Sequence, residues 1–169
     1  GGRIMSGGLG KFREDIIALL RQENIPAIAA FEPEERKWLE EPTAVVSLAR
    51  VTCTPGGFQN YLGTRTGADG QNEEWYGREA QLTVALDLYA PRTGGESACR
   101  QTMERMAEVL LSRGAGGLAV GELESGQVEF LESRGLYRLP VICRCRGWLA
   151  AAVRADGVFR DFEIRGTLS

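Results

Sequence analysis

The sequence predicts an α+β fold, in which two main helices pack on an antiparallel or mixed β-sheet. Two segments with apolar residues at helical spacing are separated by segments in which β-branched and apolar residues alternate with polar ones. The last third of the chain consists of strand-like segments joined by Gly-containing turns. The expected order is helix, two or three strands, helix, three strands, within one domain over residues 9–169.

The first helix is expected over residues 9–23, because Leu9, Phe12 and Ile16 recur at helical spacing. Asn24 and Pro26 supply its stop signal. A short edge strand near Ala27–Phe31 and a longer strand over residues 43–54 follow. Residues 1–8 contain no such pattern and are expected to be mobile.

A polar, glycine-rich segment runs from Pro55 to Tyr76 and is expected to project from the domain. Asp69-Gly70 is a favoured turn sequence, so the segment could form an extended hairpin with its tip there. The alternative is a loop that orders only against a partner.

The strand expected over residues 79–90 alternates almost without interruption. Its apolar side carries Leu82, Val84, Leu86 and Leu88. Its polar side carries Gln81, Thr83, Asp87 and Tyr89. The pattern leaves open whether that polar side holds a reactive site or meets another protein.

The second helix is expected over residues 95–113, ending at Gly114. Thr93 and Glu96 have the spacing of a capping box at its start. The buried stripe of this helix is expected to contain Cys99, Met103, Met106 and Leu110. Three antiparallel segments then follow, over residues 118–132, 136–154 and 158–166, with turns at 133–135 and at Asp156-Gly157.

Composition excludes several classes of function. A chain with 43% hydrophobic residues, 25% charged residues and a net charge of -3 is neither disordered nor a nonspecific nucleic-acid binder. It has no histidine, which removes the commonest general base and the commonest transition-metal ligand. No stretch has the length and apolarity of a membrane helix, so we expect a cytosolic protein without a membrane partner.

The four cysteines, Cys53, Cys99, Cys143 and Cys145, are expected to be reduced. Cys143 and Cys145 share a strand face with Leu139 and Val141, which favours burial over a metal site. The glycine-rich stretch at residues 114–121 follows a helix and lacks the spacing of a phosphate-binding loop. We therefore expect no cofactor, no metal and no catalytic residue.

Charge is segregated between two neighbouring strand segments. Residues 133–155 contain five arginines and no acid, whereas Glu122, Glu124, Glu129 and Glu132 lie in the preceding segment without a base. One interpretation is cross-strand charge pairing. The other is that the two strips face different subunits or a nucleic-acid path.

As an ordered whole, residues 9–166 resemble the tail terminator, or tail completion, proteins of long-tailed bacteriophages and of prophage-derived tail-like particles. The resemblance is carried by the patterns "KFREDIIALLRQENIPA", "PTAVVSLARVTC", "YLG", "YGREAQLTVALDLYAP", "RLPVICRCRGWL" and "FRDFEIRG". It implies an α+β subunit that forms a six-membered ring on the tail tube, stops tube growth and offers a surface for head attachment. It implies no catalytic residue.

The hypothesis is therefore a structural particle protein, whose partners are further copies of itself, tail-tube proteins and neck or head-completion proteins. It would assemble in the bacterial host cytoplasm and end in the virion or tail-like particle. Other neck, head-completion or tube-like proteins, and a small enzyme or ligand-binding domain, are the alternatives. The candidate assembly residues are Tyr61, Arg65, Asp69, Trp75, Arg138, Arg144 and Arg146.

Overall fold

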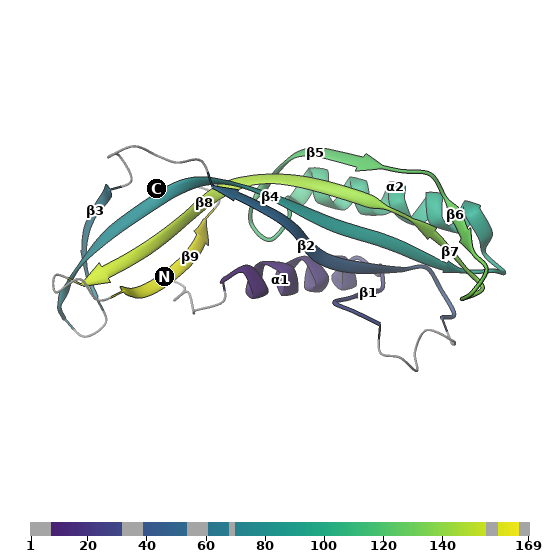
Figure 1. Cartoon of the computed structure of the whole chain (residues 1–169), viewed down its shortest axis with the longest axis horizontal. Helices are drawn as coiled ribbons and strands as arrows, with labels where there is room; N and C mark the ends of the chain where they lie inside the picture. The colour runs from purple at the N-terminus through teal and green to yellow at the C-terminus, as the bar shows by residue number, and fades with distance from the viewer. Residues whose placement is uncertain (1–7, 32–38, 54–60, 68–69, 155–158, 166–169) are drawn as a thin grey trace.

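The computed structural model describes residues 8–31, 39–53, 61–67, 70–154 and 159–165, and from residue 150 onward it describes the backbone alone. Two helices and nine strands follow one another in these ranges as helix, strands, helix, strands, which confirms the predicted α+β fold. Figure 1 shows one continuous sheet that extends beyond the helices at one end.

Helix α1 spans Gly8–Gln22 and buries one side. Phe12, Ile16 and Leu20 repeat every four residues and are at most 2% exposed. The helix ends where Asn24 adopts a φ of 61° and the Ile25 N–H donates to the Leu20 carbonyl at 2.9 Å. The predicted stop is thus confirmed. Of residues 1–8, which were expected to be mobile, residues 1–7 lie outside the described residues and Gly8 is the buried first residue of α1.

Helix α2 spans Gly95–Arg113, with the predicted bounds, and Gly114 ends it with a φ of 80°. The predicted capping box is wrong. Gly94 is the N-cap and no side chain bonds to the first turn. Glu96 is therefore the second residue of the helix, whereas a capping box needs the glutamate at the third, and it pairs with Arg100 instead. Of the predicted buried stripe, Cys99, Met106 and Leu110 are buried, together with Thr102, and Met103 is partly buried.

The sheet is built around strand β4, Asn72–Pro91, which has 20 residues and begins earlier than expected. Strand β2, Thr43–Cys53, pairs antiparallel with β4 on one side. The short strand β1, Ala27–Ile28, adds in parallel to the edge of β2 and makes the sheet mixed.

The C-terminal part of the chain contains five strands, so the prediction of three antiparallel segments is wrong in number. The first segment divides into β5, Ala119–Ser125, and β6, Glu129–Leu131. The second divides at Pro140 into β7, Leu136–Leu139, and β8, Val141–Arg154. A proline has no N–H for a sheet hydrogen bond, which explains the break. Strand β9, Phe159–Arg165, pairs with β8, and the expected turn at Asp156-Gly157 lies outside the described residues.

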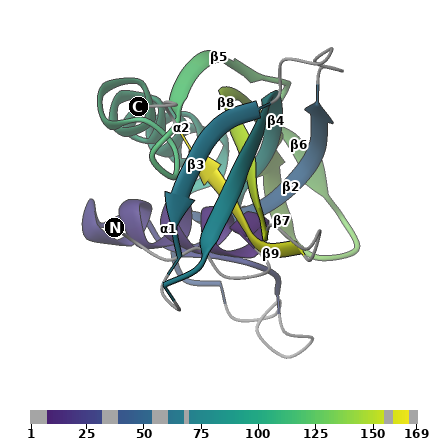
Figure 2. The ribbon, with the colours of Figure 1, turned by 90° about the vertical axis from the view of Figure 1, so that its left-hand side faces the viewer.

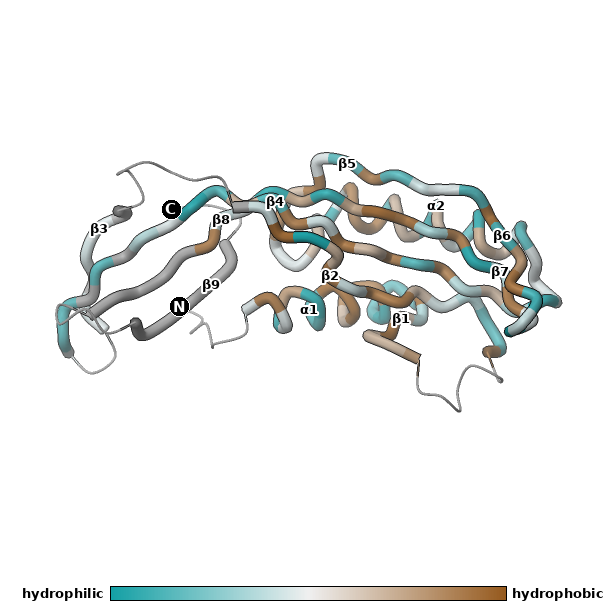
Figure 3. The backbone as a smooth tube through the Cα atoms, in the orientation of Figure 1, coloured by the Kyte–Doolittle hydropathy of each residue, from teal (hydrophilic) through white to brown (hydrophobic). Residues whose placement is uncertain are grey.

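Both helices cover the same face of the sheet, as the end-on view in Figure 2 shows. The even-numbered residues of β4 from Ala80 to Ala90 point into this layer and are at most 1% exposed. They form one apolar core with the buried sides of α1, α2, β2 and β8. In Figure 3 apolar stretches of the tube lie where the two helices pack on the sheet.

The other half is an arm of strands without a helix layer. Its strand order is β3-β4-β8-β9, with β3 comprising Tyr61–Thr66. The Gly67 N–H donates to the Gln71 carbonyl at 2.7 Å and closes the β3–β4 hairpin. For residues 61–76 the hairpin alternative is thus confirmed. Residues 54–60 and 68–69 lie outside the described ranges, so of the predicted tip at Asp69-Gly70 only Gly70 is described. Figure 1 shows this arm projecting past the start of α1.

Candidate assembly surface

The sheet face opposite the helices carries the polar side of β4. Leu82, Val84, Leu86 and Leu88 are buried beneath the helices, as predicted. Gln81 is exposed, and Thr83, Asp87 and Tyr89 are partly exposed on the other face. No helix within the described ranges covers that face, which we call the open face.

Arg138 on β7 fixes the charges at one end of the open face. Its guanidinium donates to the Asp87 carboxylate at 3.0 Å and to the Glu129 carboxylate at 2.8 Å. The hydrogen bond to Asp87 raises the pKa of Arg138 above its ordinary value, and the bond to Glu129 adds to this. Beside this cluster, the ring of Tyr89 packs edge-on against Phe31 with centroids 5.0 Å apart.

Arg144 on β8 lies between the two carboxylates of the neighbouring strand β5. Its guanidinium is 3.1 Å from Glu122 and 3.2 Å from Glu124. The hydrogen bond to Glu124, with the charge of Glu122, raises the pKa of Arg144. The interpretation of the charge strips as cross-strand pairs is therefore confirmed for Arg138 and Arg144.

Arg146 differs from these two arginines. It lies opposite Gln81 on β4 and Ala119 on β5, neither of which is charged. Its exposed side chain forms no ion pair with any residue in the described ranges. The open face thus carries a cation that is left uncompensated at this position.

A hollow of about 400 Å³ opens on this face beside Arg146. It lies where β4, β8 and β5 run side by side. The residues that line it are Gln81, Thr83, Gly121, Glu122, Arg144, Cys145 and Arg146. This polar hollow suits a side chain or short segment from another molecule more than an enclosed apolar ligand.

The cysteine pair of β8 is part of the core, as predicted. Cys143 and Cys145 are at most 1% exposed, and their sulfur atoms are 3.7 Å apart. The hydrogen bond between the thiols, followed by burial, raises the pKa of Cys145. Among the described residues, no three potential metal ligands lie in one cluster.

The predicted assembly residues fall into two groups that the structure does not bring together. Arg138, Arg144 and Arg146 lie on the open face, whereas Tyr61, Arg65 and Trp75 lie in the arm on β3 and β4. Six positions of β4 separate Trp75 from Gln81, the partner of Arg146, which is about 20 Å along a strand. Asp69 lies outside the described residues.

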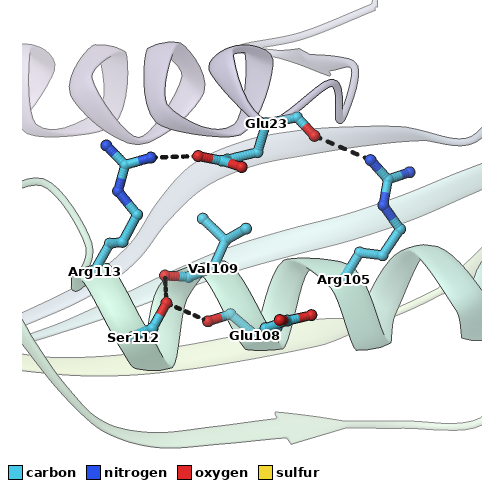
Figure 4. Close-up of polar contacts among 6 residues, drawn as sticks. All are labelled: Glu23, Arg105, Glu108, Val109, Ser112 and Arg113. Atoms are coloured by element: carbon cyan, nitrogen blue, oxygen red, sulfur yellow. Dashed lines mark hydrogen bonds and ion pairs between the residues drawn. The ribbon is translucent and has the colours of Figure 1, made fainter.

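Sequence reasoning missed a polar contact that joins the two helices (Figure 4). Arg105 of α2 donates to the backbone carbonyls of Glu23 at 3.0 Å and Asn24 at 3.3 Å, at the end of α1. Arg113 pairs with the Glu23 carboxylate. These groups border a second hollow of about 300 Å³ that Glu108, Val109 and Ser112 also line.

The role of this helix-to-helix contact is structural. Arg105 satisfies carbonyl groups that a helix end leaves without partners, and a cation is favourable at a helix C-terminus. The hydroxyl of Ser112 is likewise engaged, since it donates to the carbonyl of Glu108 at 2.6 Å. No sequence pattern could reveal this contact, because 82 positions separate Glu23 from Arg105.

Neither helix described in the structure is long and apolar enough to span a membrane. No protein-family model matches the sequence, and no curated protein matches it at a significant level.

Proposed function

We propose that this protein is a structural subunit of a phage tail or tail-like particle, a tail terminator that closes into a ring on the tail tube. The observation that carries the proposal is a sheet that extends well beyond its helix layer. Within the described part of the chain, no helix lies over the open face, and the arm extends past both helices, with a contact between α1 and β9 at its base. Surfaces of this kind are suited to contact with other subunits.

The edges of the arm support the same proposal. In the described ranges β3 pairs only with β4, and β9 pairs only with β8. Each therefore has one edge whose backbone N–H and C=O groups have no strand partner there. Such edges readily add a strand from another chain.

The polar side of β4 is engaged in structure rather than gathered around a substrate. Asp87 is neutralised by Arg138, and Tyr89 packs on Phe31. These contacts hold the side chains of the open face in fixed positions, which favours docking of another protein on it. The protein would act without cofactor or turnover, as the resemblance to tail terminators implies.

The proposed partners are further copies of this chain, the tail-tube subunit and a neck or head-completion protein. The ring would be a hexamer that forms in the host cytoplasm during assembly and stays in the finished particle. Binding energy would come from docking the open face and from strand addition at the arm.

The test combines electron microscopy with tube assembly. The purified protein is imaged by negative stain and sized by light scattering over a range of concentrations, alone and with tail-tube subunits of the same particle. We expect rings, and tubes that stop lengthening when the protein is added. A chain that stays monomeric throughout and neither binds tubes nor limits their length would refute the proposal.

The same experiment separates the alternatives. A tube-like protein would polymerise into long tubes, and a neck or head-completion protein would bind only tails that are already terminated. A ligand-binding domain would gain thermal stability from a small molecule, which a metabolite panel followed by melting temperature would detect.

A further inference from the structure

We infer that the hollow on the open face receives helix α2 of a second copy, through ion pairs from Arg50 and Arg146 to Glu104 and Glu108. The inference deepens the proposed function, on which it rests, because it names the two surfaces that meet in the ring. The contact joins the open face of one subunit to the outer side of helix α2 of the next.

The receiving surface carries two cations without a partner. Arg146 lies on β8 opposite Gln81, and Arg50 lies on β2 opposite Thr83, so both point to the same face on either side of β4. Both side chains are exposed and form no ion pair within the described ranges. Arg144, which lies on β8 opposite Thr83, is already compensated by Glu122 and Glu124.

A register shift in β2 places Arg50 on this face. Ala44 and Val46 are buried beneath the helices, and strict alternation would direct Leu48 and Arg50 the same way. The pairing with β4 shifts by one residue between Leu48 and Arg50. The resulting bulge turns Arg50 to the open face, next to the hollow.

The inserting surface is the outer side of α2. Glu104 and Glu108 are one turn apart and differ by about 40° around the axis, on the side opposite the buried stripe. Both are exposed, and neither forms a hydrogen bond or an ion pair through its carboxylate in the described part of the chain. Of the nearby charges on this helix, Glu96 pairs with Arg100 and Arg113 with Glu23. Arg105, which lines the same hollow as Glu108, donates to the carbonyls of Glu23 and Asn24.

The dimensions of the two surfaces match. Four residues of helix advance about 6 Å, which sets the separation of the two carboxylates along the axis. Arg50 and Arg146 are two strand spacings and one residue pair apart, about 12 Å between backbones. Both arginines have long, flexible side chains, and bending of each over Gln81 and Thr83 would bring the guanidinium groups within reach of the two glutamates.

The placement of these surfaces favours a second copy as the occupant. The outer side of α2 and the open face lie on opposite sides of the two-layer molecule (Figure 2). A contact between them is therefore heterologous, with each subunit offering one surface to each neighbour. Repetition of such a contact closes a ring when its rotation permits.

A charge-swap experiment tests the contact. Variant one is Arg50→Glu with Arg146→Glu, variant two is Glu104→Arg with Glu108→Arg, and variant three combines all four substitutions. The matched control is Arg92→Glu with Arg134→Glu, which changes charge equally at two exposed arginines outside the arm and outside the proposed contact. Ring formation, alone and on tail tubes, is measured by analytical ultracentrifugation and electron microscopy, with circular dichroism and melting temperature as folding checks.

We expect variants one and two to need at least tenfold higher concentration for half-assembly, because each brings like charges together. Variant three should recover assembly to within about threefold of the wild type, and the control should match the wild type. Folded variants one and two that assemble normally, or a folded variant three that does not recover, would overturn this contact alone. A wild-type protein that forms no ring under any condition overturns the proposed function and this contact with it.

Discussion

Two adjacent leucines at the end of α2 provide a sharp test of the packing. Leu110 is 0% exposed and belongs to the core, whereas Leu111 is 60% exposed. Leu110→Ala removes three carbon atoms, about 2.4 kcal/mol of transfer free energy, and leaves a cavity. We expect its free energy of unfolding to fall by about 3–4 kcal/mol and its melting temperature by about 10 °C. Leu111→Ala, the same chemical change one residue later, should stay within about 0.5 kcal/mol of wild type.

Urea unfolding followed by circular dichroism measures both variants, at a concentration where light scattering shows a monomer. The dependence of the unfolding free energy on urea should be unchanged, so that the shift of the midpoint reports stability. Equal losses for the two variants, or a loss below about 1 kcal/mol for Leu110→Ala, would refute the assignment of the buried side of α2.

Three further predictions follow from the described contacts. Arg138→Ala breaks two ion pairs on the open face and should lower the free energy of unfolding by about 1 kcal/mol, measured in urea. Arg100→Ala breaks one exposed ion pair on α2 and should change the free energy of unfolding by less than about 0.5 kcal/mol. Gly114→Ala should lower the free energy of unfolding by about 2–3 kcal/mol, because a Cβ there would lie 2.6 Å from the Leu118 carbonyl oxygen. Gly117 has a similar positive φ but open space around it, so Gly117→Ala should lower the free energy of unfolding by about 1 kcal/mol. Equal losses for the two variants would contradict the steric argument. In a Cys53→Ser background the native protein should resist thiol labelling by mass spectrometry until urea unfolds it, and rapid native labelling would contradict the burial of Cys99, Cys143 and Cys145.

The sequence predicted the elements whose signals are local. Asn24 and Gly114 end their helices because each adopts a left-handed backbone conformation, and both stops were visible as residue types. The buried side of β4 followed from strict alternation. The start of β4 did not, since Asn72–Arg78 has no such pattern and is held by pairing on both sides with β3 and β8.

Some local signals were misread. Thr93 and Glu96 have capping-box spacing, but the helix begins after Gly94, one position too late for that box. Pro140 marked a strand break that hydrophobic continuity concealed, because Leu139, Val141 and Cys143 all face the core on either side of it. In both cases the residue type indicated a boundary, a helix start or a strand break. The position at which the backbone placed that boundary decided whether the prediction was right.

The candidate surface was predictable only in part. Arg138, Arg144 and Arg146 were recognised as a basic strip, and the facing acids on β5 and β6 as its complement. Which arginines are neutralised depended on register, since Arg138 also reaches Asp87, 51 positions away. Glu104 and Glu108 were simply exposed helix residues until the fold showed which side of α2 they occupy.

The sequence by itself determined the α+β class, the two helices and the apolar side of the central strand, because periodicity and stop residues act over one or two turns of chain. Only the tertiary structure decided which strands are neighbours, where the sheet leaves its helix layer, and which charges stay unpaired. Arg50 is the clearest case, since a one-residue register shift in β2 turns it to the open face, whereas strict alternation would turn it to the buried side. Register is a property of two strands together, so no single stretch of sequence contains it.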